Sequence, residues 1–284
     1  MKALYDIPAP AKLNLFLHIT GRRADGYHLL QSAFMLIDWA DTLHFELRPA
    51  GISREDLLQP LPADDLIVRA ARALQAASGT GLGAHIAVEK RLPAQAGMGG
   101  GSSDAASTLL ALNRLWQLNL SLEQLAAIGL KLGADVPFFL HGRHAWVEGI
   151  GEQITPLTLP HGQVLVVKPD SGLETRAIFS DPALKRDTIP AILSGFAADP
   201  YGFGHNDLQP VAQRLCPGVT QALDWLATLG LRGRMTGSGS AVFAWAPPSF
   251  SVPKAPDAME ARLCCSLDAH PLAGWATSDR VVGR

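Results

Sequence analysis

The feature that most constrains this chain is a glycine-rich stretch that runs directly into an apolar helical segment. Residues 97–101 read Gly-Met-Gly-Gly-Gly, the next three are Ser102, Ser103 and Asp104, and an alanine- and leucine-rich run continues to Trp116. Ser and Asp next to a helical run predict a capped N-terminus. Closely spaced glycines let backbone N–H groups approach an anion, and a helix N-terminus adds unpaired donors and a positive dipole end. The stretch therefore predicts a binding site for phosphate oxygens.

A plainer interpretation of the same stretch is a flexible turn before a capped helix. Two familiar nucleotide motifs are excluded. No Gly-Lys-Ser/Thr of a Walker A loop follows, and position 102 is Ser where a dinucleotide fingerprint starting at Gly97 needs Gly. A second cluster, residues 236–241, reads Thr-Gly-Ser-Gly-Ser-Ala and is explained equally well by a hairpin turn or a phosphate contact. Neither serine lies in the Gly-x-Ser-x-Gly elbow of a hydrolase.

Composition narrows the classes of function further. The net charge of −2 over 284 residues leaves no electrostatic footprint for nucleic acid, so any anion must be held locally. Cys216, Cys264 and Cys265 lack the spacing of a disulfide or zinc framework, which favours a reducing, cytoplasmic setting. We expect neither a signal peptide nor a membrane span, because the N-terminus lacks an apolar core and no run of 18 apolar residues occurs. The oligomeric state stays open.

Hydrophobic periodicity predicts an α+β chain of two domains, residues 1–155 and 156–284, since the strand and helix pattern restarts near residue 155. Ser121 with Gln124 forms a possible capping box for a helix that Gly133 would close. The predicted strands are 13–20, one starting at Tyr27, 85–89, 164–167, 232–235 and 241–245; the predicted helices are 65–77, the run to 116, 219–229 and 257–267; residues 247–256, with four prolines, are predicted as a loop.

Three segments together resemble the GHMP kinases, a family of small-molecule kinases. Residues 93–106 resemble the family's ATP-phosphate motif, residues 10–15 its first motif and residues 237–240 its third, in the family's order. The resemblance implies a left-handed β-α-β crossover in the first domain, an exception to the usual right-handed rule, and a ferredoxin-like second domain. It also implies ATP as co-substrate, with Mg²⁺ that arrives with the nucleotide and is assigned no protein ligand. The residues it assigns to ATP are Pro93, Ala94, Gln95, Ala96, Gly97, Met98, Gly99, Gly100, Gly101, Ser102 and Ser103.

Residues 21–28, 133–139 and 205–208 resemble one branch of this family, the diphosphocytidyl-methylerythritol kinases. This implies ATP-dependent phosphorylation of the 2-hydroxyl of a cytidine diphosphate conjugate on the non-mevalonate isoprenoid route. Two alternatives stay open. One is a GHMP kinase that acts on another small sugar or alcohol. The other is a catalytically silent nucleotide-binding module, whose signature would be loss of Lys12 or Asp135, and both residues are present.

Lys12 and Asp135 are the candidate catalytic residues. From the residues alone, Lys12 in an apolar strand is most simply a side chain that snorkels to solvent, and Asp135 after a helix end is most simply structural. The resemblance implies that Asp135 accepts the proton of the substrate hydroxyl. It implies that Lys12 pairs with Asp135 and stabilises the developing alkoxide and the γ-phosphate. Asn14, on the same strand as Lys12, resembles a substrate contact.

The candidate base pocket involves residues far apart in the sequence. Without the resemblance, residues 25–28 predict a hairpin turn, and Phe179 fits the core of a short helix. The resemblance implies that Tyr27 stacks on cytosine, His28 reads its polar edge, and Phe179 covers the other face. The residues assigned to the substrate are Asn14, Tyr27, His28, Thr175, Phe179, Gly237, Ser238, Gly239 and Ser240.

Overall fold

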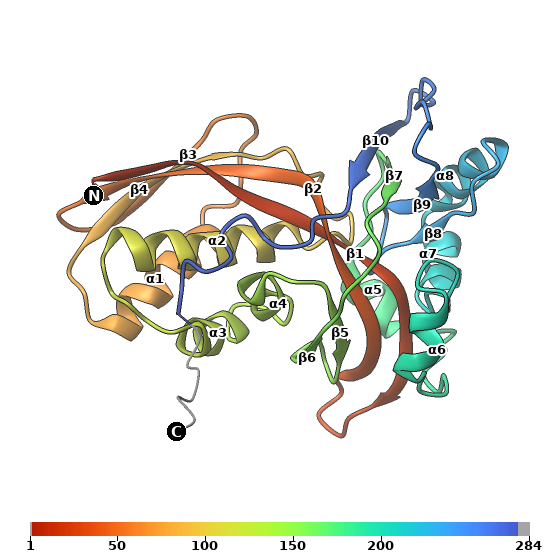
Figure 1. Ribbon diagram of the computed structural model, residues 1–284, viewed down its shortest axis with the longest axis horizontal. Helices are drawn as coiled ribbons and strands as arrows, with labels where there is room; N and C mark the ends of the chain where they lie inside the picture. Colours follow the sequence, from red (N-terminus) through yellow and green to blue (C-terminus); the bar gives the residue numbers. More distant parts are fainter. Residues whose placement is uncertain (1, 278–284) are drawn as a thin grey trace.

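The computed structural model describes residues 2–277, and two long antiparallel strands connect its two α+β parts (Figure 1). Strand β1 (Ala3–Arg22) pairs with β2 (His28–Arg48) along nearly its whole length. Register shifts interrupt the pairing at four places, including those between Pro10 and Lys12 and between Asn14 and Leu17. Bulges bend and twist a strand, so the pair curves from the N-terminal sheet into the second part of the molecule.

The N-terminal part is one sheet covered by helices. Its strand order is β3-β4-β2-β5-β6, with β1 on β2, and only β3 and β4 run parallel. Helix α1 connects these two parallel strands; the predicted left-handed sense of this crossover stays a prediction. The strands and helices not yet bounded are β3 (Ile52–Asp56), β4 (Gly83–Glu89), β5 (Ala145–Glu148), β6 (Gln153–Pro156), α1 (Leu66–Ser78), α2 (Gly100–Leu115), α3 (Leu122–Leu130) and α4 (Val136–His141).

The C-terminal part is an antiparallel sheet in the order β10-β7-β9-β8, which is the strand order of a ferredoxin-like fold. The helices pack beside this sheet (Figure 1). Apolar side chains of β7, β9 and α8 form its core, among them Leu165, Val242 and Leu226. The elements are β7 (Gln163–Pro169), α5 (Thr175–Ser180), α6 (Leu193–Ala198), α7 (Gln209–Leu215), α8 (Pro217–Thr228), β8 (Arg234–Met235), β9 (Val242–Ala246) and β10 (Met259–Cys265).

Two predictions about individual elements were wrong. The helix predicted over 257–267 is strand β10, which pairs with β7 from Met259 to Cys265. Its alternation of exposed Glu260 and Arg262 with less exposed neighbours has the period of a strand, and pairing with a buried strand decided the outcome over helix propensity. Ser102, Ser103 and Asp104 do not cap α2, which begins at Gly100 with Gly99 as its N-cap. The capping box of Ser121 and Gln124 is confirmed.

Beyond β10, a segment that we call the return segment, residues 266–277, leaves the second part and packs on the first. Leu267 N donates to Leu36 O over 2.9 Å, and His270 N donates to Gly142 O over 2.8 Å. Leu272 is only 3% exposed and lies in the core between the N-terminal sheet and its helices. The N-terminal core is therefore completed by residues near the opposite end of the chain.

Within residues 2–277, none of the helices combines the length and apolar character that crossing a lipid bilayer requires.

The return segment yields a prediction about stability. Leu272→Ala should lower the free energy of unfolding by about 2–4 kcal/mol, because it removes apolar contacts and leaves a cavity in the N-terminal core. Ile189→Ala is the matched control: this side chain is 85% exposed, and its loss should change stability by less than about 0.5 kcal/mol. Urea titration followed by circular dichroism measures both, and equal effects would show that the return segment does not contribute to the core.

Candidate active site

A cleft of about 1650 Å³ lies where β1, the glycine-rich stretch and the loops of the C-terminal part meet. It brings together nearly all of the residues singled out in the sequence. Ser103 and Ser240 do not reach its surface: both are fully buried, and their hydroxyls donate to Pro10 O and Ser171 O. The predicted residues that line the cleft are Lys12, Asn14, Tyr27, His28, residues 93–102, Asp135, Thr175, Phe179, Gly237, Ser238 and Gly239.

The two glycine clusters pack against each other, backbone to backbone. Gly97 has φ of 71°, and a Cβ there would lie 2.3 Å from the carbonyl oxygen of Thr236. A Cβ on Gly237 would lie 2.5 Å from the carbonyl oxygen of Gly97. Real Cβ atoms do not approach so closely, and positive φ is costly for other residues. Glycine at both positions is therefore required for the contact between the two parts of the molecule.

The first backbone N–H groups of α2 belong to residues that line the cleft. These groups belong to Gly100, Gly101 and Ser102, which precede the first intrahelical bond, made by Ser103 N to Gly99 O. Such groups lack intrahelical acceptors, and the helix dipole adds partial positive charge. All three residues line the cleft, so this end of it suits anionic oxygens.

Lys12 and Asp135 form the charged centre of the cleft. Lys12 Nζ lies 3.5 Å from Asp135 Oδ2 and 2.5 Å from Asn14 Oδ1. Asn14 Nδ2 in turn donates to Ser32 Oγ over 2.9 Å, which fixes the amide so that its oxygen faces the lysine. The Lys12 side chain is 5% exposed and that of Asp135 is 29% exposed. The ammonium is therefore held by buried partners, while the carboxylate stays open to a ligand.

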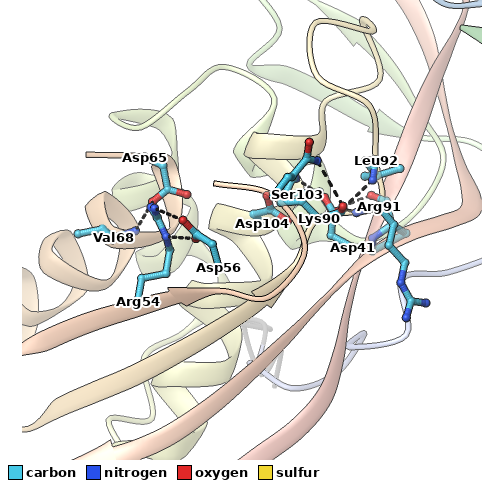
Figure 2. Close-up of polar contacts among 12 residues, drawn as sticks. Asp41, Arg54, Asp56, Asp65, Val68, Lys90, Arg91, Leu92, Ser103 and Asp104 are labelled. Carbon is cyan, nitrogen blue, oxygen red and sulfur yellow. Dashed lines mark hydrogen bonds and ion pairs between the residues drawn. The ribbon is translucent and has the colours of Figure 1, made fainter. Parts of the chain in front are cut away.

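A second charged group borders the α2 N-terminus, where Lys90 lies between Asp41 and Asp104 (Figure 2). Lys90 Nζ donates to Asp104 Oδ2 over 2.6 Å and also bonds Asp41. Asp41 Oδ1 accepts from the backbone N–H groups of Arg91 and Leu92 over 2.6 and 2.7 Å. One ammonium thus connects β2, through Asp41, to the first turns of α2 and to the chain that enters the glycine-rich stretch.

The Lys90 group carries one more carboxylate than ammonium. Burial raises the pKa of Asp104 to about 8, against the opposing attraction of Lys90, and the charge of Asp41 adds to the rise. Burial favours neutral Lys90, but Asp104 and Asp41 outweigh it and raise the Lys90 pKa. Asp104 Oδ1 has no hydrogen-bond partner among the described residues, although Asp104 lines the cleft. A proton on Asp104 would relieve the excess negative charge.

Figure 2 also shows how the entrance to α1 is fixed. Asp65 caps α1 by accepting from Val68 N over 3.1 Å, and its carboxylate pairs with Arg54 over 2.6 Å. Arg54 is shared with Asp56 at 2.6 Å. Asp65 and Leu66 line the same end of the cleft as Lys90.

At the other end of the cleft, aromatic groups gather around His28. Its ring centroid lies 5.0 Å from that of Phe179 on α5, and Arg186 Nε donates to His28 Nε2 over 3.0 Å. Tyr27 is 60% exposed, so its ring face is open. Thr175 Oγ1 lies 2.7 Å from Ser238 Oγ, which joins α5 to the second glycine cluster.

Residues 205–208 connect β1 to the second glycine cluster. The backbone of this segment pairs with Leu17, and Asp207 Oδ2 accepts from Ile19 N over 2.7 Å. Asn206 is 3% exposed, and its Nδ2 donates to the carbonyls of Met235 and Gly237 over 2.9 and 2.8 Å. Asn206 therefore holds the cluster in place from behind, without lining the cleft.

Sequence reasoning missed Lys90, Asp41, Asp104, Asn206 and Arg186 as parts of this arrangement. Asp104 lay in the quoted motif, but its partners come from positions 41 and 90, which no local pattern connects. Asn206 lies in residues 205–208, which the resemblance included, but the carbonyls to which it donates are about 30 residues away in the sequence. Arg186 had no signal in the sequence.

Comparison with known families defines the class of protein to which this cleft belongs. Residues 65–143 match the GHMP kinases N terminal domain, and residues 189–263 match the GHMP kinases C terminal family. These two matches fall on the two parts of the molecule that share the cleft.

Individual relatives narrow the class further. A 4-diphosphocytidyl-2-C-methyl-D-erythritol kinase from Albidiferax ferrireducens is 73% identical over 282 residues, covering 99% of this chain and 98% of the relative. One from a Polaromonas species is 66% identical, covering 97% and 95%. A crystal structure of 4-(cytidine 5'-diphospho)-2C-methyl-D-erythritol kinase is 35% identical, with a TM-score of 0.77 over 91% of this chain and 98% of that one. The chain belongs to the GHMP kinase family, in its 4-diphosphocytidyl-2-C-methyl-D-erythritol kinase branch.

The position of Asn206 predicts a loss of activity beyond a loss of stability. Asn206→Ala should lower kcat/KM by about 10²-fold, because it lets the second glycine cluster shift in the wall of the cleft, and small displacements of positioning groups cost that much. It should also lower the free energy of unfolding by about 1–3 kcal/mol, since buried carbonyls lose their donor. Asn113→Ala is the matched control, because Asn113 makes two comparable bonds to Leu120 away from the cleft. A similar kinetic loss in both variants would contradict the positioning role.

The raised pKa of Asp104 predicts how stability depends on pH. A carboxyl whose pKa is higher in the folded state binds more protons when folded. The stabilisation that Asp104 contributes is therefore complete below its ordinary pKa of 3.8 and is lost as pH rises through its folded-state pKa of about 8. Asp104→Asn should remove this dependence, so the variant gains stability relative to wild type by at most about 1.4 kcal/mol per pH unit.

Urea unfolding between pH 4 and pH 8 measures this difference. Asp56→Asn is the control: the hydrogen bond from Arg54 lowers the pKa of Asp56, so its stabilisation is lost only below its ordinary value of 3.8, and its difference from wild type should be nearly constant across this range. A constant difference between Asp104→Asn and wild type across this range would refute the prediction.

Proposed function

We propose that this protein transfers the γ-phosphoryl group of ATP to the 2-hydroxyl of 4-diphosphocytidyl-2-C-methyl-D-erythritol, on the non-mevalonate route to isoprenoids. The observation that carries the proposal is the Lys12–Asp135 pair, which lies between the α2 N-terminus and the aromatic group around His28 in one continuous cleft. A phosphate donor at one end and a cytidine conjugate at the other would meet at this pair. The named relatives support the choice of substrate.

The proposed reaction needs positioning and charge more than covalent help from the protein. The backbone N–H groups at the start of α2 bind the phosphate oxygens of ATP. Asp135 accepts the proton of the 2-hydroxyl as this oxygen attacks phosphorus. Lys12 lies 3.5 Å from Asp135 and stabilises charge on the transferred phosphoryl group. Asn14 holds the ammonium in this position through its amide oxygen.

Mg²⁺ is the metal that such a reaction uses, and it binds phosphates with one or two protein oxygens and several waters. Within residues 2–277 no cluster of three or more His, Cys, Asp or Glu side chains could hold a metal ion alone. The oxygen groups beside the proposed phosphate site include Ser102 Oγ, the Asp135 carboxylate and Asp104 Oδ1, which is unpartnered in the described part of the chain, and they fit an ion that arrives with ATP. When bound, the ion neutralises phosphate charge.

The base end of the cleft is proposed to hold cytosine between Tyr27 and Phe179, with His28 beside its polar edge. Aromatic faces suit a flat heterocycle, and a histidine supplies a hydrogen bond at the edge. We also propose the division into residues 1–155, with the phosphate loop and catalytic residues, and 156–284, on the substrate side. A cytoplasmic location is supported by Cys216, Cys264 and Cys265, which are unpaired.

A coupled ADP-release assay tests the substrate directly. The purified protein is assayed with 4-diphosphocytidyl-2-C-methyl-D-erythritol beside galactose, mevalonate and homoserine. We expect turnover with the cytidine conjugate alone. Turnover with another member of this set would identify a different small-molecule kinase, and release of ADP with none of them would support a silent nucleotide-binding module.

The role of Asp135 predicts a specific kinetic loss. Asp135→Asn keeps the size of the side chain but removes its charge and proton affinity, so kcat should fall by roughly 10²- to 10⁴-fold while ATP affinity changes little. Asp257→Asn, an exposed aspartate remote from the cleft, should leave kcat unchanged. Single-turnover kinetics separates the chemical step from product release. A chemical step within about threefold of wild type would remove Asp135 from the mechanism.

A further inference from the structure

Arg186, which no sequence motif singled out, links the two sides of the proposed base pocket. Its guanidinium donates to the carbonyls of Leu184 over 2.8 Å, Asp181 over 2.8 Å and Phe179 over 3.1 Å. A fourth donor, Nε, reaches His28 Nε2 over 3.0 Å. The arginine is half-buried and lines the cleft. One rigid group thus fixes the end of the helix that bears Phe179 and touches the histidine opposite.

The contact with Arg186 determines which ring nitrogen of His28 carries the proton. A guanidinium has only donors and stays protonated in proteins, so His28 Nε2 must accept. Burial lowers the pKa of His28, and the positive charges of Arg186 and Arg22 lower it further, so the imidazole is neutral. A neutral imidazole with Nε2 as acceptor carries its proton on Nδ1. Nδ1 is then the hydrogen-bond donor that His28 can offer to a ligand.

We propose that Arg186 is a positioning residue that holds His28 in its Nδ1-protonated tautomer, and that this donor selects cytosine over uracil by meeting N3 of the base. This inference rests on the proposed function and specifies how the base is read. N3 of cytosine is an acceptor, whereas N3 of uracil carries a hydrogen. The same Nδ1–H group therefore bonds cytosine and opposes uracil, donor against donor.

The hydrogen bonds from Arg186 to backbone carbonyls hold the guanidinium in the position from which it donates to His28. Because Leu184, Asp181 and Phe179 each accept from the guanidinium, Arg186 cannot turn away from His28 without losing those bonds. The Phe179 ring lies 5.0 Å from the His28 ring, so the proposed stacking face and the proposed edge reader share one support. Two N–H donors that face each other, as His28 Nδ1–H and uracil N3–H would, cost about 1–3 kcal/mol relative to a hydrogen bond, which corresponds to roughly 5- to 150-fold in affinity.

The experiment combines nuclear magnetic resonance with nucleotide competition on the full chain. Nitrogen-15 shifts of labelled histidines report the tautomer, and the His28→Phe spectrum assigns the His28 signals. We expect Nδ1–H in the wild type and a shift toward the Nε2–H form in Arg186→Met. CMP should bind roughly 10- to 100-fold more tightly than UMP in the wild type, and this ratio should fall toward one in Arg186→Met. Arg186→Gln provides a second variant if the first does not fold.

Arg214→Met is the matched control, because Arg214 supports the same loop through the Asp181 carboxylate. It should leave the tautomer and the CMP to UMP ratio unchanged. An Nε2–H form in the wild type, an unaltered tautomer in Arg186→Met, or an equal change in Arg214→Met would each overturn the proposal. A protein that binds neither nucleotide would overturn the selection of cytosine together with the proposed function, whereas the tautomer of the free protein tests Arg186 separately.

Discussion

The contact between Gly97 and Gly237 is the constraint on which the cleft depends. Two backbones can approach this closely only where neither residue has a side chain, so the contact sets the distance between the glycine-rich stretch and the loops of the second part. β1 lies across the same junction. Lys12 N donates to Met98 O on one side, and Asn14 N donates to Thr236 Oγ1 on the other. The strand that bears Lys12 is therefore bonded to both glycine clusters.

Charged side chains hold the two ends of the cleft in different ways. Beside the N-terminus of α2, Lys90 joins three segments of backbone through two buried carboxylates, and the arrangement has an excess negative charge when both carboxylates are ionised. Beside His28, Arg186 is satisfied by neutral carbonyls and one imidazole. A cation that donates to neutral carbonyls holds a loop in place without an ionised carboxylate as its partner. The first arrangement therefore favours a protonated carboxyl group, because burial raises the pKa of Asp104, whereas the second disfavours a protonated imidazole, because burial and Arg186 lower the pKa of His28.

The sequence was enough to predict the parts of the site that lie in short local motifs. The glycine-rich stretch, the helix after it and the capping box at Ser121 follow from local rules, and the resemblance to the GHMP kinases led to Lys12 and Asp135, which the structure brings within 3.5 Å. Strand β10 was missed because its pairing with β7 is a tertiary event. Arg186 and Asn206 could not be predicted, since each acts on groups that only the folded chain brings near.

The return segment has a consequence for how the protein is made. The ribosome produces the N-terminal sheet and its helices first, but Leu272, which fills part of their core, is synthesised only after the whole C-terminal sheet. Until then the first part has an incomplete apolar interior exposed to solvent, and its burial waits for the last strand to pair. Final packing of the N-terminal core is thereby joined to completion of the C-terminal sheet, and a nascent chain arrested before the return segment would expose apolar surface that the finished protein buries.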